Sequence, residues 1–297
     1  MKKIYKLSQF IDSSMVIKDG SFGIVGNANI KDKSNVLCYA SNLEFIEIAE
    51  KNPNISAIIT TSELRHKTTK AVAVYDEPVF LYGEILNEFI VNGLIKPRMD
   101  YKISKSLVVD ESSFISPKCY IGDNVSIGKN VIINDYTIIE DNCIIGDNVV
   151  LGCEGFYFRR RKSGEVVKFL HAGGVHLHKN VEIMTGSMIQ RAHDEFTTIG
   201  RGTKISVNVN IGHGCKIGEN NIITGRVQVA GWTKIGNNCW IGNSSIIADY
   251  VNIGDNASIK IGSVVVKDVV AGEQVSGNFA YNHTRRIRNF AREQREK

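Results

Sequence analysis

The sequence predicts a mainly β protein: a parallel β-helix with a small α/β domain before it and a short helix after it. An aliphatic residue returns at every sixth position from Ile199 to Val265 without interruption. An α-helix of 3.6 residues per turn does not keep such a series on one face, whereas each six-residue repeat forms one short side of a β-helix coil. Glycine often follows the aliphatic residue, as in Ile217-Gly218 and Ile241-Gly242, where it relieves the backbone at a corner.

The same period runs through the preceding part of the chain and is interrupted twice. One series spans Ile103 to Leu151, and a second spans Leu177 to Ile189. The first insertion is 152–174. The second is 190–198, which makes the step from Ile189 to Ile199 four residues longer than the repeat allows. Insertions in a repeat protein form loops on one face, commonly the binding face.

Three parts are expected along the chain, with bounds 1–100, 101–275 and 276–297. The first part combines strand-like runs with helical stretches and predicts a small α/β nucleotide-binding domain. Its expected strands are 55–60 and 71–74, and its expected helices are 44–50 and 79–90. The last part predicts a short basic helix with Ile287 and Phe290 on one side.

Composition places the chain among ordinary globular proteins. The 297 residues are 43% hydrophobic and carry a formal net charge of +5, much of it in two basic runs, 159–162 and 285–288. Such runs form a solvated face or bind phosphates, and no nucleic-acid-binding motif accompanies them. The six cysteines include no Cys-x-x-Cys pair, and no signal peptide or membrane span is expected. These features predict a cytoplasmic protein with reduced thiols.

Three repeats make one coil, so residues eighteen apart stack, and this places His213 at a corner. The same corner is Gly231 one coil later and, after correction for the second insertion, Arg191 one coil earlier. An imidazole accepts a proton near neutral pH, and a glycine amide stabilises an oxyanion. Two alternatives remain for His213: an ordinary surface residue at a corner, or a ligand in a zinc site of three histidines across a subunit boundary. Four cysteines, Cys119, Cys143, Cys215 and Cys239, are interpreted as small core residues.

Further motifs accompany His213 and Gly231: 152–157, Gly173-Gly174-Val175, Asn180-Val181-Glu182-Ile183, Arg191, Thr198-Ile199-Gly200-Arg201-Gly202, Ile211-Gly212-His213, Ile217-Gly218-Glu219-Asn220 and Val229-Ala230-Gly231. With these motifs the sequence resembles the UDP-3-O-acylglucosamine N-acyltransferases of lipid A biosynthesis, over most of the chain. The resemblance implies a left-handed β-helix, with His213 as general base and Gly231 as oxyanion donor. It also implies that Tyr39, Asn42 and Phe45 hold a uracil ring.

Departures from that family leave the substrate open. Tyr250 stands where the family has a second active-site histidine, and Gln190 replaces an acidic residue. The segments 261–269 and 276–280 are similar to the closing part of coenzyme A-dependent sugar acetyltransferases, where they lie near the adenine of the coenzyme. The basic tail would suit the phosphates of coenzyme A or the acidic surface of an acyl carrier protein.

The resulting hypothesis is an N-acyltransferase that acts on a nucleotide-linked amino sugar for a surface glycan. Its acyl donor would be acyl-CoA or acyl carrier protein, with no tightly bound cofactor and no metal. The expected assembly is a homotrimer. The residues expected to bind substrate are Tyr39, Asn42, Phe45, Arg191 and Tyr250. The alternatives are the lipid A enzyme itself, with a long 3-hydroxyacyl donor on carrier protein, and a non-catalytic β-helix scaffold.

Overall fold

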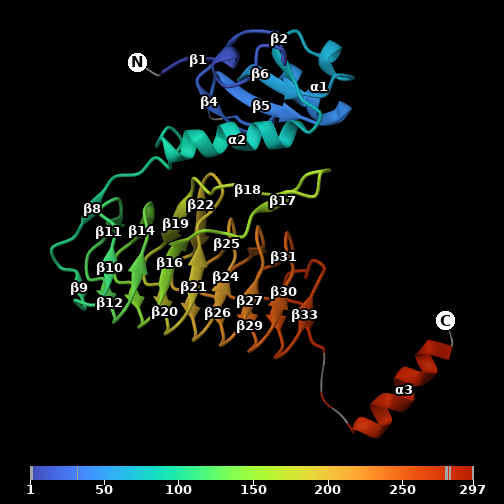
Figure 1. The fold of residues 1–297 in the computed structure, drawn as a ribbon. Coiled ribbons are helices and arrows are strands. Elements are labelled where there is room, and N and C mark those ends of the chain that lie inside the picture. The colour runs from blue at the N-terminus through green and yellow to red at the C-terminus, as the bar shows by residue number, and fades with distance from the viewer. Residues whose placement is uncertain (1–2, 32, 278–279, 281, 296–297) are drawn as a thin grey trace. The chain divides into compact units, whose positions relative to one another are not determined.

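A computed structural model describes residues 3–277 except 32, together with residues 280 and 282–295. The chain forms two compact units (Figure 1). The N-terminal unit comprises Met1–Pro97 and Phe156–Ala172, and the β-helix unit comprises Arg98–Gly155 and Gly173–Lys297. Most of the first insertion therefore belongs to the N-terminal unit rather than to the β-helix that it interrupts.

The N-terminal unit is an α/β fold around a five-stranded sheet of order β2-β7-β6-β5-β4. Strands β4 to β7 pair in parallel, and β2 pairs antiparallel with β7. The four elements expected from the sequence are confirmed as α1, β6, β7 and α2. The elements are β1 (Tyr5–Lys6), β2 (Val16–Lys18), β3 (Ser21–Phe22), β4 (Ile24–Val25), β5 (Val36–Ala40), α1 (Leu43–Lys51), β6 (Ile55–Thr60), β7 (Ala71–Val74), α2 (Pro78–Val91), β17 (Phe158–Arg160), β18 (Val166–Lys168) and the short 3-10 turns η1 (Leu7–Gln9) and η2 (Arg65–Lys67).

The first basic run lies in the β17–β18 hairpin, and one of its residues is structural. Arg161 forms ion pairs with Glu84 of α2 and with Glu165, and its guanidinium stacks 4.5 Å from the ring centre of Phe80. Its side chain is only 13% exposed. The positive charge of Arg161 therefore holds the hairpin to α2 within the N-terminal unit.

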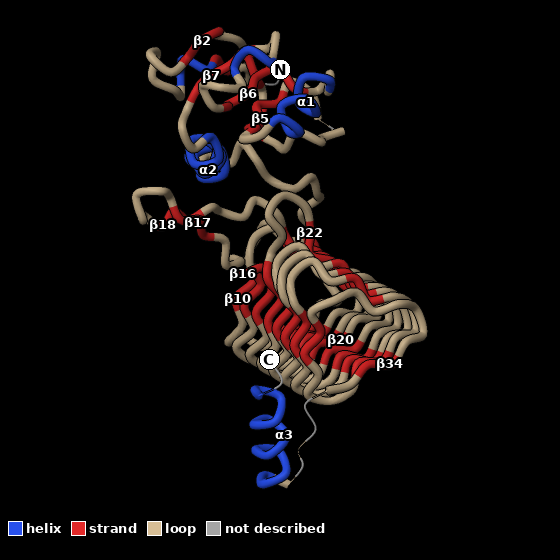
Figure 2. The backbone as a smooth tube through the Cα atoms, turned by 90° about the vertical axis from the view of Figure 1, so that its right-hand side faces the viewer, coloured by secondary structure: helices blue, strands red, loops and turns tan. Residues whose placement is uncertain are grey.

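The β-helix unit consists of three parallel sheets, each a ladder of short strands from successive coils (Figure 2). The expected left-handed parallel β-helix is confirmed. Sheet I contains β10 (Phe114–Ile115), β13 (Ile132–Ile133), β16 (Val150–Cys153), β21 (Met188–Gln190), β24 (Asn210–Ile211), β27 (Gln228–Val229), β30 (Ile246–Ile247) and β33 (Val264–Val265). Sheet II contains β8 (Lys102–Ile103), β11 (Tyr120–Ile121), β14 (Thr137–Ile139), β19 (Gly174–Leu177), β22 (Phe196–Ile199), β25 (Lys216–Ile217), β28 (Lys234–Ile235) and β31 (Asn252–Ile253). Sheet III contains β9 (Val108–Val109), β12 (Ser126–Ile127), β15 (Ile144–Ile145), β20 (Glu182–Ile183), β23 (Lys204–Ile205), β26 (Ile222–Ile223), β29 (Trp240–Ile241), β32 (Ser258–Ile259) and β34 (Gln274–Val275).

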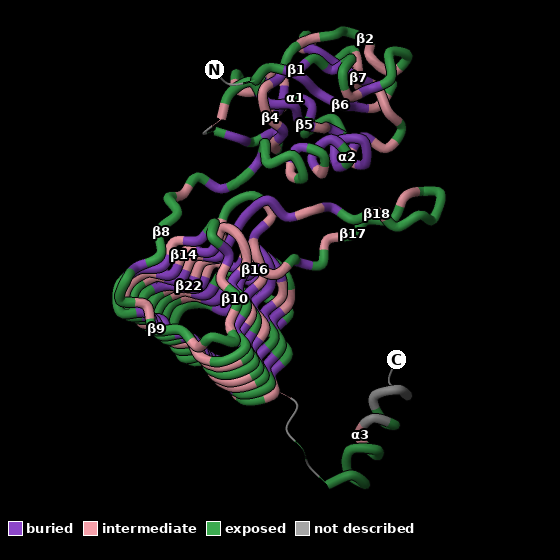
Figure 3. Tube along the Cα trace, turned by 60° about the vertical axis from the view of Figure 1, so that its left-hand side comes forward, coloured by how far each residue is buried: buried purple, intermediate pink, exposed green. Residues whose placement is uncertain are grey.

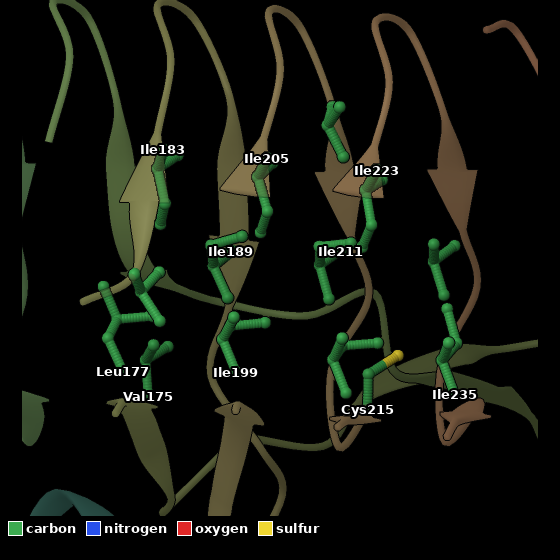
Figure 4. Packing of buried hydrophobic residues seen from close by; sticks show 14 of the residues in the cluster. Val175, Leu177, Ile183, Ile189, Ile199, Ile205, Ile211, Cys215, Ile223 and Ile235 are labelled. Atoms are coloured by element: carbon green, nitrogen blue, oxygen red, sulfur yellow. The ribbon is translucent and has the colours of Figure 1, made fainter. Parts of the chain in front are cut away.

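The repeated aliphatic residues fill the interior of the β-helix. Figure 3 shows buried positions recurring along successive coils, and Figure 4 shows Ile183, Ile205 and Ile223 stacked along sheet III. Burial of each such side chain stabilises the fold by about 1.5–3 kcal/mol. Two expected core residues are exceptions, because no coil precedes the first one: Ile103 is 45% exposed and Val109 is 41% exposed.

The corners need a different explanation from the one that the sequence suggested. The residue with positive φ lies three positions after the aliphatic residue and is most often asparagine, as at Asn220 and Asn238. Asparagine tolerates this left-handed conformation better than most residues. The glycine directly after the aliphatic residue has another role, since a Cβ on Gly218 would lie 2.5 Å from the carbonyl oxygen of Gly236 in the next coil. Close approach of successive coils therefore requires it.

The C-terminal helix expected from the sequence is α3 (His283–Arg295). Ile287 is 52% exposed, and the side chain of Phe290 lies outside the described residues. Among the residues that the structure describes, no helix is both long enough and apolar enough to cross a membrane.

Candidate active site

The turns between sheets I and II form one edge of the β-helix, here called the I–II edge. Both insertions leave the repeat at this edge, after β16 and after β21. The regular turns of the edge span 116–119, 134–136, 212–215, 230–233 and 248–251. His213, Gly231 and Tyr250 all lie in these turns, so the coil geometry gathers the expected residues of the β-helix along a single edge.

The register places His213 and Gly231 in successive coils. Ile211 pairs with Ile189 on one side and with Val229 on the other, so Arg191, His213 and Gly231 occupy equivalent turn positions. His213 is only 7% exposed, and its backbone N–H donates to Gln190 Oε1 at 3.2 Å. A Cβ on Gly231 would lie 2.9 Å from His213 Nε2. A side chain at position 231 would therefore displace the imidazole from the place it occupies against the next coil.

The amide of Gly231 already has a hydrogen-bond partner that the sequence did not suggest. Its N–H donates to Asp249 Oδ1 of the following coil at 2.9 Å. The same bond recurs between residues eighteen apart at another corner, where Asn237 N donates to Asp255 Oδ1. An oxyanion held by the Gly231 amide would have to displace the Asp249 carboxylate.

Arg191 is tied into the I–II edge by backbone carbonyls. Its Nε donates to Gly152 O at 2.7 Å, and its guanidinium also donates to Asp135 O at 3.3 Å. The backbone N–H of Arg191 donates to Cys153 O at 2.9 Å. These bonds join three coils where the chain leaves the repeat, and they place a half-buried positive charge one coil before His213.

Trp232 and Tyr250 form an aromatic pair next to His213, and only Tyr250 was expected from the sequence. The rings of Trp232 and Tyr250 stack with centroids 5.2 Å apart and an interplanar angle of 5°. The Trp232 ring also contacts the His213 ring in an edge-to-face arrangement, with centroids 4.2 Å apart. Both aromatic residues have positive φ, and Tyr250 is 65% exposed. An aromatic residue at a turn position usually held by asparagine is the signal that would have singled out Trp232.

The residues expected to hold a nucleobase lie together at one end of β5 in the N-terminal unit. Tyr39 is in β5, and its ring centroid lies 4.9 Å from that of Tyr82 in α2. Asn42 caps α1, because its Oδ1 accepts the backbone N–H of Phe45 at 2.9 Å. Phe45 is 41% exposed. The cap gives a local structural reason for Asn42 and leaves an accessible aromatic face beside it.

The cysteines of the β-helix interior are poor nucleophiles. Burial raises the pKa of Cys215 to about 12 and the pKa of Cys119 and Cys143 to about 11. The Cys215 thiol donates to Ala230 O at 3.0 Å. A thiol that stays protonated at neutral pH does not attack a thioester, which agrees with the interpretation of these residues as core fillers.

One group of side chains outside the I–II edge has the composition of a metal site. Among the described residues, Glu140, His176 and His178 place one ligand atom each within 4.8 Å of one another. Both histidines lie where the chain returns to the β-helix unit after the first insertion.

Comparison with known proteins supports the β-helix and the resemblance read from the motifs. Residues 118–153 match the family model described as bacterial transferase hexapeptide (six repeats), so the chain carries that repeat. The UDP-3-O-acylglucosamine N-acyltransferase of Campylobacter lari is 43% identical over 75 residues, 25% of this chain and 24% of the relative. The enzyme of the same name from Helicobacter pylori is 42% identical over 76 residues, 26% of this chain and 23% of the relative.

The resemblance to this family is thus confirmed over a limited stretch. The matched stretch spans about a quarter of the length of these relatives. The motifs predicted a resemblance over most of this chain, so the matched stretch is shorter than expected. A solved UDP-N-acetylglucosamine acyltransferase from Campylobacter jejuni is 22% identical, with a TM-score of 0.49, over 63% of this chain and 81% of that one.

Proposed function

We propose that the chain is an N-acyltransferase that moves an acyl group from a thioester donor to the amine of a nucleotide-linked amino sugar. The observation that carries the proposal is the contact between the buried His213 and Gly231 at the edge where both insertions leave the repeat. The partial similarity to UDP-3-O-acylglucosamine N-acyltransferases supports the reaction class. We further propose that it works in the cytoplasm as a homotrimer.

The proposed mechanism is direct transfer. His213 accepts a proton from the sugar amine, and the amine attacks the thioester carbonyl. The carbonyl oxygen becomes an oxyanion, which takes the Gly231 N–H as its donor in place of Asp249. Collapse of the intermediate forms the amide and expels the donor thiol, which leaves with the proton that His213 held. The buried cysteines take no part, since their thiols stay protonated at neutral pH.

The remaining expected residues would bind the two substrates. Tyr39, Asn42 and Phe45 would hold the nucleobase, because an aromatic face stacks on a base and an amide reads its edge. Arg191 would place positive charge near an anionic group of the substrate, and Tyr250 would offer its exposed ring next to Trp232, which contacts His213. The donor would bind as a substrate, acyl-CoA or acyl carrier protein, rather than as a resident cofactor.

A second candidate is the lipid A enzyme that acylates UDP-3-O-(3-hydroxyacyl)glucosamine from acyl carrier protein. The names of the relatives favour it. Tyr250 and Gln190 favour a different substrate, because the family is expected to have a histidine and an acidic residue there.

A donor screen separates the two. The full-length chain would be offered UDP- and dTDP-linked amino sugars and O-acylated UDP-glucosamine, each with short acyl-CoA and with long-chain acyl carrier protein. Transfer from short acyl-CoA to an amino sugar supports the preferred function. Reaction only between carrier protein and the O-acylated substrate supports the lipid A enzyme. A chain that turns over no pair contradicts both.

A further inference from the structure

Three side chains converge on the outer face of sheet II, away from the I–II edge. Glu140 directly follows β14, and His176 lies in the neighbouring strand β19, with His178 just beyond its end. Glu140 Oε1 lies 2.8 Å from His176 Nε2 and 3.1 Å from His178 Nδ1. The two imidazole rings lie with centroids 4.1 Å apart at an interplanar angle of 32°. One carboxylate oxygen and two ring nitrogens therefore lie within 4.8 Å of one another.

The arrangement fits the coordination chemistry of zinc. Two imidazoles and one carboxylate are a common set of protein ligands for Zn²⁺, with bonds of about 2.0–2.2 Å, which places neighbouring ligand atoms about 3.3 Å apart. The distances from Glu140 Oε1 are close to that spacing. The side chains of Glu140, His176 and His178 are 27%, 21% and 40% exposed, so water can reach a fourth coordination position.

Contacts around the three side chains hold them in place. Glu140 Oε2 accepts the backbone N–H of Lys179 at 3.1 Å, which leaves Oε1 directed at the histidines. The nearby cations have other partners: Lys179 Nζ pairs with Asp141 at 2.8 Å, and Lys216 Nζ lies 3.5 Å from Glu195. Hydrogen bonds that orient a ligand raise metal affinity.

Burial favours the neutral form of one ligand. Desolvation lowers the pKa of His176, although Glu140 opposes the shift. A histidine must be neutral at the binding nitrogen to accept a metal ion, so this shift adds to the geometric argument.

We propose that Glu140, His176 and His178 bind one Zn²⁺ ion that joins two neighbouring coils of the β-helix. Glu140 belongs to the coil before the first insertion, and both histidines belong to the coil after it. The chain leaves the β-helix unit between these coils and returns at Gly173. A metal ion bound to both coils would stabilise the repeat where its backbone is interrupted, because a ligand that binds only the folded state favours it.

The test is metal binding to the full-length chain after treatment with a chelator. Calorimetric titration with Zn²⁺ near neutral pH is expected to give one tight site per chain. Glu140→Gln and His176→Gln keep similar side-chain volume and are expected to weaken binding more than about 100-fold, the upper end of the effect of losing a second-shell partner. The matched control is His66→Gln, which removes an exposed histidine of the N-terminal unit and should bind as the wild type does. Zn²⁺ should raise the thermal midpoint of the wild type and the control only.

Circular dichroism checks that the variants fold, and Co²⁺ supplies a readout from the wild type alone. Tetrahedral Co²⁺ with nitrogen and oxygen ligands gives visible absorption bands, which are expected here. Absence of both a Zn²⁺ site and these bands in the wild type overturns the proposal, as does equal binding by His176→Gln. The result would then describe a histidine–carboxylate hydrogen-bond cluster only. These readouts need no acyl transfer, so they stand or fall separately from the proposed function.

Discussion

Two corners of the same β-helix have the same backbone arrangement but carry different side chains. At the corner between sheets II and III, here called the regular corner, Glu219, Asn237 and Asp255 succeed one another at intervals of one coil. The side chains of Asn237 and Asp255 each accept the backbone N–H of the residue one coil earlier. At the I–II edge the equivalent positions are His213, Gly231 and Asp249. The bond from the Gly231 N–H to Asp249 is the counterpart of the bond from the Asn237 N–H to Asp255. The difference lies in side chains alone, since the strands on both sides keep the same parallel register.

The difference also extends to the residues in the left-handed conformation. Asn220, Asn238 and Asn256 hold these positions at the regular corner, whereas Trp232 and Tyr250 hold two of them at the I–II edge. Bulky residues are uncommon with positive φ, so the aromatic pair has a conformational cost that asparagine would avoid. Such local cost commonly marks a functional position.

The largest expected effect is the loss of the histidine. His213→Asn should lower kcat about 10²- to 10⁴-fold, because a positioned general base contributes that much to a proton transfer. Steady-state acyl transfer measures it. The matched change Glu219→Gln lies at the equivalent position of the regular corner and should leave kcat unchanged; an equal loss in both variants would refute a special role for the I–II edge.

A smaller loss is expected when a methyl group is added beside the imidazole. Gly231→Ala places a Cβ 2.9 Å from His213 Nε2, so the ring must move. Displacement of a catalytic group by about 1 Å costs about 10²-fold in rate. Gly225→Ala is the control, because its Cβ would meet Val207 at an ordinary 3.5 Å. Wild-type kcat in Gly231→Ala would show that His213 is not held against Gly231 during the reaction.

Removal of the capping carboxylates should separate stability from activity. Asp249→Ala and Asp255→Ala each delete an acceptor of a backbone N–H, and each should lower the free energy of unfolding by about 1 kcal/mol. Only Asp249→Ala frees the Gly231 amide, so it alone should raise kcat/KM. Denaturant unfolding and acyl transfer are the measurements. A fall in kcat/KM specific to Asp249→Ala would instead make that carboxylate part of the catalytic apparatus.

The smallest effect is expected at the thiol nearest the histidine in the chain. Cys215→Ala should retain the wild-type kcat. Burial raises the pKa of Cys215 to about 12, so its thiol stays protonated at neutral pH and does not act as a nucleophile. Iodoacetamide at neutral pH should leave the native chain active for the same reason. Inactivation that Cys215→Ala prevents would point to a covalent acyl-cysteine.

The repeat could be predicted from the sequence because one aliphatic residue in six is a direct signature of a coil. Counting in coils also placed His213 opposite Gly231, which the register bears out. The bond from the Gly231 amide to Asp249 was not predicted, since the aspartate lies a whole coil away and its role depends on backbone geometry. The convergence of Glu140 with His176 was hidden for a similar reason: the first insertion separates them in the chain, although β14 and β19 are neighbours in sheet II.

The N-terminal unit was less visible in the sequence. Its helices and longer strands were recognised from their apolar runs, but the short strands β1 to β4 have two or three residues each and no usable periodicity. The β17–β18 hairpin was read as a loop of the β-helix, because only tertiary contacts, such as the bond from Asn87 Nδ2 to Lys168 O, assign it to the N-terminal unit.

Acyl transfer at His213 on the I–II edge can be tested directly. The most direct measurement is mass spectrometry of single-turnover reactions that contain a nucleotide-linked amino sugar and a thioester donor, with the wild type, His213→Asn and Glu219→Gln side by side. General-base catalysis by His213 predicts an amide-linked sugar product from the wild type and Glu219→Gln, almost none from His213→Asn, and no acylated protein in any sample. Undiminished product from His213→Asn, or an acylated protein that forms before the product, would contradict it.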